Sequence, residues 1–263
     1  MNRYISEAYS QNLPAEKQRE VMHRYILGVY ALYEKILAKY PELLIESCAG
    51  GGGRFDPGLL YYAPQTWTSD DTDAVERLKI QYGTSFIYPL SAIGSHVSEV
   101  PNHQVARTTS LKMRGDVAAF GTFGYELDST KLNETEKKII KEQIKQVKEW
   151  QQLIHQGTFY RLKSPFEENT TAWMVVSLDQ TEALVGIYQV LAKPNPVYER
   201  IQLMGLKEDK LYRINEGKVD RYGDDLMQAG LILGENYIGR AHEYWSRDMP
   251  GDYSSRIYHL KEK

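Results

Sequence analysis

Polar side chains follow several short apolar runs of this chain, where predicted strands end. Such positions matter because catalytic groups of parallel α/β barrels lie at the carboxyl ends of the strands. The candidates for chemistry are Glu46, Ser47, Cys48, Asp70, Asp71, Asp73 and His96.

Asp70 is the strongest candidate, because it closes a predicted short strand three residues after Trp67. An aromatic wall disfavours the ionised form of a carboxylic acid, so Asp70 suits a general acid that delivers a proton to a leaving oxygen. The alternative is a helix cap, since Ser-Asp-Asp-Thr-Asp before a helix satisfies free backbone amides without any chemistry. We assign the cap to Asp71 or Thr72 and catalysis to Asp70.

Other polar positions carry weaker signals. Cys48 is a nucleophile or, more commonly for such a thiol, a buried side chain without a reactive role. The four glycines at 50–53 let the backbone approach a ligand closely or simply form a loop with positive φ angles; they lack the ending of a phosphate-binding loop. His96 and His103 flank a loop that contains proline, and we expect ordinary loop histidines there.

Composition excludes several classes of protein. The 263 residues carry a net charge of −3 without a basic stripe, so a nucleic-acid partner is not expected. One cysteine and six dispersed histidines give no metal-site pattern and suit a reducing, cytoplasmic compartment. The sequence has no apolar stretch of about 18 residues, so no membrane partner is expected either.

Hydrophobic periodicity indicates the elements that hold these residues. Apolar residues at helical spacing predict a helix from Pro14 to Tyr40, and Asn133 with Glu136 predicts a capping box at the start of a helix that ends at Gly157. Further helices are expected over 72–82 and near 108–115. Parallel strands are expected over 43–48, 65–70, 90–96 and 117–127, the first of them buried.

Four strand–helix units amount to half of a barrel, since a closed (β/α)8 barrel needs eight strands. From residue 158 onward, short alternating runs and turn-forming groups such as residues 222–225 predict an antiparallel region. The runs cover 173–178, 183–191, 199–206, 210–214 and 256–260. The sequence thus predicts an α/β fold: the C-terminal half of a (β/α)8 barrel over residues 1–157, followed by an antiparallel β-sandwich domain over 158–263.

Ordered motifs then identify a family. Cys48-Ala49-Gly50-Gly51-Gly52-Gly53-Arg54-Phe55-Asp56 and Pro64-Gln65-Thr66-Trp67-Thr68-Ser69-Asp70-Asp71-Thr72-Asp73 resemble the α-galactosidases of glycoside hydrolase family 36. The match continues through Gly94-Ser95-His96-Val97-Ser98, Pro101-Asn102-His103-Gln104, Arg114-Gly115-Asp116-Val117 and Phe123-Gly124-Tyr125-Glu126-Leu127. It spans essentially the first 155 residues and continues more loosely through the β region.

The resemblance implies a retaining hydrolysis of terminal α-galactosyl residues, with Asp70 as acid/base and no cofactor or metal. It also assigns sugar contacts to Asn2, Cys48, Gly51 and Trp67. The family's nucleophile is the Asp of a Lys-Trp-Asp-Met-Asn-Arg motif, and this chain begins Met1-Asn2-Arg3. We therefore expect the nucleophile to precede Met1 and the chain alone to be inactive.

The expected partners are an α-galactoside oligosaccharide of the melibiose or raffinose type and the missing N-terminal half of the barrel. A homo-oligomer is expected for the full-length protein. Two alternatives remain open at this point. One is a noncatalytic remnant or carbohydrate-binding fragment; the other is a related family 36 specificity, such as an α-N-acetylgalactosaminidase or a galactosyl transferase.

Overall fold

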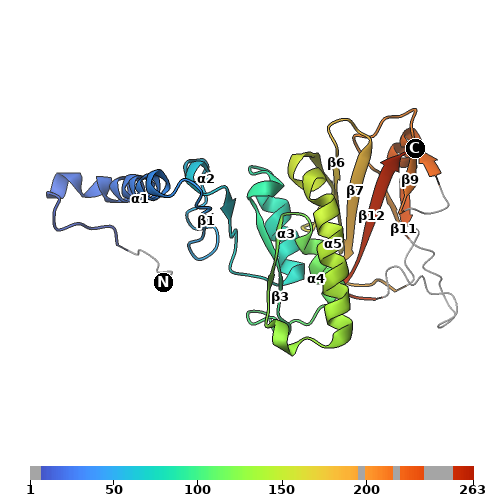
Figure 1. The fold of residues 1–263 in the computed structure, drawn as a ribbon, viewed down its shortest axis with the longest axis horizontal. Helices are drawn as coiled ribbons and strands as arrows, with labels where there is room; N and C mark the ends of the chain where they lie inside the picture. Colours follow the sequence, from blue (N-terminus) through green and yellow to red (C-terminus); the bar gives the residue numbers. More distant parts are fainter. Residues whose placement is uncertain (1–6, 195–198, 216–219, 234–250) are drawn as a thin grey trace. The chain divides into compact units, whose positions relative to one another are not determined.

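A computed structural model describes residues 7–194, 199–215, 220–233 and 251–263 (Figure 1). The chain divides into two compact units, Met1–Asp70 and Asp71–Lys263. Asn2, which the resemblance assigns to the sugar, lies outside the described residues. Within those ranges, every helix is too short or too polar to cross a bilayer.

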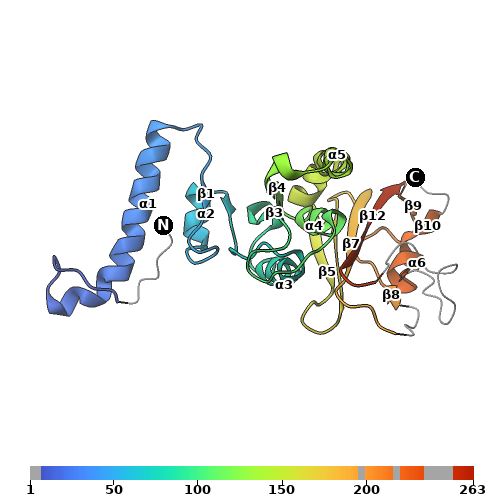
Figure 2. The ribbon, with the colours of Figure 1, turned by 90° about the horizontal axis from the view of Figure 1, so that it is seen from below.

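The first unit contains one long helix and a small parallel sheet. After a 3-10 turn over Ala15–Glu20, helix α1 runs over Val21–Lys39 and forms a single continuous helix (Figure 2). Strand β1 (Glu46–Ser47) pairs in parallel with β2 (Gln65–Thr66), and helix α2 (Pro57–Tyr62) lies between them in the sequence. The predicted long helix is confirmed, with its first residues wound as a 3-10 turn.

The buried strand predicted over 43–48 is wrong in both length and burial. Only two residues pair as a strand, and Leu43 and Leu44 are 46% and 85% exposed. The apolar run suggests burial because leucine side chains usually face a core. The described part of the chain supplies no layer that covers Leu44.

The second unit begins with alternating helices and strands, as the sequence predicts. Its elements before residue 157 are α3 (Ala74–Thr84), a 3-10 turn (Leu90–Ala92), β3 (Gly94–Ser98), α4 (Leu111–Ala118), β4 (Thr122–Glu126), a 3-10 turn (Ser129–Lys131) and α5 (Glu134–Gln156). Strands β3 and β4 pair in parallel, with Gly94 opposite Thr122 and Ser98 opposite Glu126.

The start and end of α5 confirm the sequence prediction. The Asn133 side chain accepts a hydrogen bond from the Glu136 amide, and the Glu136 carboxylate accepts one from the Asn133 amide, each at 2.9 Å. Gly157 follows the last helical residue. A capping box satisfies two backbone donors that a helix start leaves free, so these residues fix where α5 begins.

Several predicted boundaries are wrong. The strand predicted over 65–70 covers only Gln65–Thr66, and of the run predicted over 199–206 only Glu199–Ile201 is a strand. Leu90–Ala92 forms a 3-10 turn and the strand starts at Gly94, whereas Val117 belongs to α4 and its strand starts only at Thr122. The turn predicted at 222–225 opens helix α6 (Gly223–Gln228). In each case the short run is compatible with a helix, a strand or a turn, because it has too few residues to distinguish the helical period from the strand period.

An antiparallel sheet of six strands follows, in the order β10-β9-β12-β7-β6-β5. A separate two-stranded antiparallel pair joins β11 to β8. The strands are β5 (Thr158–Lys163), β6 (Thr170–Val176), β7 (Glu182–Gln189), β8 (Glu199–Ile201), β9 (Leu211–Ile214), β10 (Asp220–Tyr222), β11 (Leu231–Leu233) and β12 (Ser254–Glu262). The predicted antiparallel region is confirmed, but β5, β10 and β11 are strands that the sequence did not predict.

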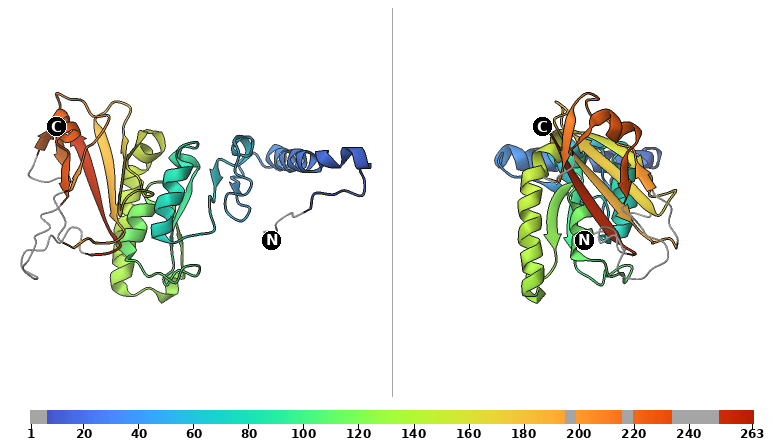
Figure 3. Two further views of the ribbon diagram at one scale, coloured as in Figure 1. Left: turned by 180° about the vertical axis from the view of Figure 1, so that it is seen from behind. Right: turned by 90° about the vertical axis from the view of Figure 1, so that its right-hand side faces the viewer.

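The sheet has an apolar core on each face, because side chains alternate along its strands. Met174 and Val185 face a cluster that includes Leu226 of α6, whereas Trp173 and Leu184 face residues of α3, α4 and α5. Figures 1 and 3 show α5 lying alongside the sheet. The second unit therefore has helices on one face of the sheet and α6 with the β8–β11 pair on the other.

Candidate active site

Strands β1 and β2 place two of the predicted site residues side by side. Ser47 pairs with Thr66, and Cys48 and Trp67 are the residues that directly follow the two strands. The Trp67 amide donates a hydrogen bond of 2.9 Å to the Ser47 carbonyl, which extends the parallel pairing by one step. Trp67 is 8% exposed and Cys48 is a half-buried free thiol.

The glycine loop after β1 packs directly against the segment that contains Asp70. Gly51 has φ +71, and a Cβ atom there would lie 2.4 Å from Ser69 Cα and 2.7 Å from the Asp70 amide nitrogen. At Gly52 a Cβ atom would lie 2.8 Å from the Thr68 carbonyl oxygen. Only glycine combines this conformation with this close approach, so the loop fixes the backbone of residues 68–70.

Arg54 and Asp56 anchor the far end of the loop. Arg54 Nη2 donates to the Cys48 carbonyl at 3.1 Å. The Asp56 carboxylate caps α2 through the Leu59 amide at 2.9 Å and accepts a second bond from Tyr30 Oη at 2.8 Å. The hydrogen bond to Asp56 raises the pKa of Tyr30 above its ordinary value. The loop is therefore tied at both ends within the first unit.

Asp70 itself is exposed and stands at the last position of the first unit. The sequence predicts that Asp70 closes a strand over 65–70, but β2 ends at Thr66, and Asp70 lies in the segment that follows it. The backbone of Asp70 lies against Gly51. Of the predicted site residues, the structure thus brings Cys48, Gly51, Trp67 and Asp70 into one small region of the first unit.

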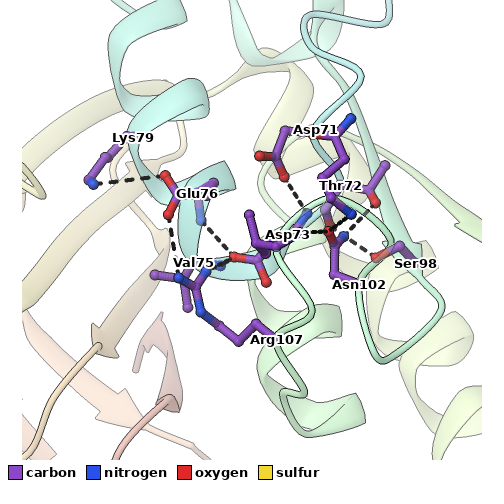
Figure 4. Close-up of polar contacts among 11 residues, drawn as sticks. Asp71, Thr72, Asp73, Val75, Glu76, Lys79, Ser98, Asn102 and Arg107 are labelled. Atoms are coloured by element: carbon purple, nitrogen blue, oxygen red, sulfur yellow. Dashed lines mark hydrogen bonds and ion pairs between the residues drawn. The ribbon is translucent and has the colours of Figure 1, made fainter.

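The predicted cap at Asp71 or Thr72 is wrong, because Asp73 caps α3. Its carboxylate accepts from the Val75 and Glu76 amides at 3.0 and 3.1 Å (Figure 4). The helix begins at Ala74, so the residue with extended backbone just before it is Asp73. Asp71 accepts instead from the Asp73 amide at 2.9 Å, which tightens the turn that leads into the helix.

Two residues of the loop after β3 support this turn, and the sequence did not predict their contacts. Arg107 makes an ion pair with Asp73, and Asn102 donates to Thr72 Oγ1 at 3.0 Å (Figure 4). Burial alone would lower the pKa of Arg107, but the charge of Asp73 leaves it above the ordinary value. Asn102 lies in a motif that resembles the family, whereas Arg107 carried no local signal, since its partner is 34 residues away.

The histidine expectation is partly wrong, since His96 lies within β3 rather than in a loop. Its Nδ1 atom is 3.9 Å from the Glu126 carboxylate. Gly124 leaves room for the ring, since a Cβ atom there would lie 2.7 Å from His96 Cδ2. His103 is exposed. Over the described ranges, the side chains of His, Cys, Asp and Glu form no group of three suited to a metal ion.

Comparison with known families matches almost the whole chain. The melibiase family matches residues 1–157, and the glycosyl hydrolase family 36 C-terminal domain matches residues 170–260. These two matches lie on either side of the change from the helix–strand region to the antiparallel sheet.

Curated relatives are α-galactosidases. Alpha-galactosidase AgaA of Geobacillus stearothermophilus is 58% identical over 233 residues, which are 89% of this chain and 32% of the relative. Alpha-galactosidase Mel36A of Lactobacillus acidophilus is 43% identical over 261 residues, which are 99% of this chain and 34% of the relative. The chain spans about a third of the length of these relatives.

Solved structures agree with this relationship. A variant of AgaA in complex with raffinose is 52% identical to this chain, with a TM-score of 0.90. The match covers 100% of this chain and 35% of the AgaA chain. The α-galactosidase from Lactobacillus brevis is 48% identical, with a TM-score of 0.91. This match covers 100% of this chain and 35% of the Lactobacillus brevis chain. With a melibiase region over residues 1–157 and a C-terminal domain of glycosyl hydrolase family 36 over residues 170–260, the chain belongs to glycoside hydrolase family 36.

Proposed function

We propose that this chain forms part of a retaining α-galactosidase in which Asp70 is the acid/base. The observation that carries the proposal is the packing of Gly51 against the Ser69–Asp70 backbone, which joins the glycine loop, Trp67 and Asp70 in one region. An exposed carboxyl group at this position can donate a proton to a glycosidic oxygen and later activate water. Cys48, Gly51, Trp67 and Asn2 are the proposed sugar contacts.

The proposed substrates are oligosaccharides with a terminal α-galactosyl unit, of the melibiose or raffinose type. Relatives with known structures include one in complex with raffinose and one in complex with stachyose, which supports this class. We also propose the finer architecture of half a (β/α)8 barrel over 1–157 and an antiparallel β-sandwich over 158–263. A cytoplasmic location and a homo-oligomer of the full-length protein complete the proposal.

Retaining hydrolysis needs a second carboxyl group about 5 Å from the acid/base, across the sugar. We propose that a part of the protein outside residues 1–263 supplies it, a proposal that is supported by the chain spanning about a third of the length of its relatives. Residues 1–263 alone should then show no turnover of an aryl α-galactoside. Hydrolysis by the purified chain would contradict this part of the proposal.

The role of Asp70 is tested by Asp70→Asn in the full-length protein that contains this chain. Raffinose has a poor leaving group, so its kcat/KM should fall by roughly 10² to 10⁴. A dinitrophenyl α-galactoside needs no proton to depart and should lose at most about tenfold in kcat/KM. Azide should accelerate turnover of the activated substrate, because it attacks the glycosyl-enzyme without a general base.

Asp71→Asn is the matched control, because the amide oxygen of Asn can still accept the bond from the Asp73 amide. This variant should treat both substrates alike. Equal losses on both substrates in Asp70→Asn, with no effect of azide, would show that Asp70 is not the acid/base.

A further inference from the structure

Two of the three residues that follow Asp70, Thr72 and Asp73, are held by the end of β3 and by the loop between β3 and α4. Thr72 and Asp73 are 4% and 2% exposed, although both carry polar side chains. Buried polar groups are ordinarily satisfied by partners that fix their position. The partners here come from residues 98–107 and include Ser98, Asn102 and Arg107.

Thr72 is held on two sides. Its hydroxyl accepts from Asn102 Nδ2 and its carbonyl accepts from Ser98 Oγ, each at 3.0 Å. Asn102 is 3% exposed, and its side-chain oxygen accepts from the Gln104 and Val105 amides at 2.9 and 3.2 Å. The donor face of Asn102 is therefore aimed at Thr72 by hydrogen bonds on its other face.

Asp73 is held by charge. Arg107 pairs with the Asp73 carboxylate and reaches Glu76 with its second nitrogen at 3.5 Å. The Arg107 carbonyl accepts from the Asn102 amide at 2.9 Å, so the same loop presents both side chains (Figure 4). A guanidinium group with two carboxylate partners restricts their positions more than a single surface ion pair does.

The backbone before residue 71 is also restrained, since the Asp70 amide lies against Gly51. General acid catalysis needs the carboxyl group within hydrogen-bond reach of the leaving oxygen, and a displacement of about 1 Å can cost 10² in rate. We propose that Asn102 and Arg107 are positioning residues for the Asp70 carboxyl group and act through the backbone of residues 71–73. This inference rests on the proposed function of Asp70.

The test measures kcat/KM for raffinose and for a dinitrophenyl α-galactoside in Arg107→Met and Asn102→Asp of the full-length protein. A displaced acid should cost about tenfold or more on raffinose and less than about threefold on the activated substrate. Asn102→Asp keeps both acceptor bonds within the loop and loses the donor to Thr72, so it keeps the test usable if Arg107→Met fails to fold. Arg107→Lys should restore part of the raffinose activity.

Lys79→Met is the matched control, because Lys79 also pairs with Glu76, at 3.8 Å, but does not touch Asp73. It should leave both substrates unchanged. Equal losses on both substrates, or none, in Arg107→Met and Asn102→Asp would overturn the positioning role. If Asp70→Asn itself lacks the leaving-group dependence, the proposed function fails first, and the two failures are thereby distinguished.

Discussion

The two units of the chain carry amphipathic helices of similar design but bury them very differently. Helix α1 of the first unit has no buried residue, and its Leu27 and Leu32 are 50% and 54% exposed. Helix α5 of the second unit buries Leu153 and Ile154 against the sheet, at 7% and 3% exposure. An apolar stripe shows which face of a helix needs a partner, but not whether its own unit supplies one.

The same contrast holds for the strands. In the second unit, β6 is buried along its whole length and packs Trp173 against Tyr188 with ring centroids 4.9 Å apart. In the first unit, Leu43 and Leu44 before β1 stay exposed. The second unit thus has the core of an independent domain, whereas residues 7–70 bury only a small set of side chains around the glycine loop.

Two leucine substitutions test this difference most strongly. Leu184→Ala removes a side chain that is 0% exposed in the second unit and should lower the free energy of unfolding by about 2–5 kcal/mol. Leu44→Ala removes one that is 85% exposed and should change it by less than about 0.5 kcal/mol. Urea unfolding of residues 1–263 measures both. A large loss in Leu44→Ala would mean that the first unit has a core of its own.

Two glycine substitutions then compare the closely packed glycine loop of the first unit with its exposed helix α1. Gly51→Ala forces a side chain into φ +71 and against Ser69 Cα, so it should cost more than about 1–2 kcal/mol. Gly28→Ala, within α1, meets nothing within 4 Å and should stabilise the helix by about 0.5–1 kcal/mol.

Amide hydrogen exchange is the measurement for this pair. Protection at Trp67 and Ala49, whose amides bond to Ser47 and Gly51, should drop in Gly51→Ala and stay unchanged in Gly28→Ala. If Gly51→Ala left both amides protected, the close packing of the glycine loop on residues 69–70 would not be required for the fold.

The sequence predicts best what depends on neighbours along the chain. The capping box of α5 joins residues three apart, and the interruption at Gly157 lies next to the last helical turn. Both follow from local hydrogen bonding, so the limits of α5 are predicted correctly. The cap of α3 is harder, because three acidic residues precede it and only the backbone conformation selects Asp73.

The site is predicted only where family motifs mark it. Cys48, Gly51, Trp67 and Asp70 are found together, but their approach depends on a parallel pairing between segments 19 residues apart. Arg107 was missed, since its partner Asp73 is distant in sequence and an arginine in a loop has many possible roles. Such long-range pairs are set by tertiary packing, which hydrophobic periodicity does not encode.

A last difference between the units is the presence of a buried carboxyl group in the second unit. The described carboxylates before residue 71 are exposed or half-exposed, whereas the Asp116 side chain in α4 is 14% exposed between Lys112 and Ser255. Burial raises the pKa of Asp116, and Lys112 opposes this only in part. The native state then holds this proton to higher pH than the unfolded state does, so stability falls as pH rises through the raised native pKa.

Asp116→Asn removes that titration and keeps the shape of the side chain. Relative to the variant, the unmodified chain should lose stability between its ordinary aspartate pKa and the raised native value, with a slope of at most about 1.4 kcal/mol per pH unit. Urea unfolding at a series of pH values measures the difference. Asp220, whose pKa is lowered to about 2 by Arg213 and Lys263, is the control, since Asp220→Asn should give a slope of the opposite sign at lower pH. A flat difference for Asp116→Asn would show that this carboxylate is solvated as fully as those of the first unit.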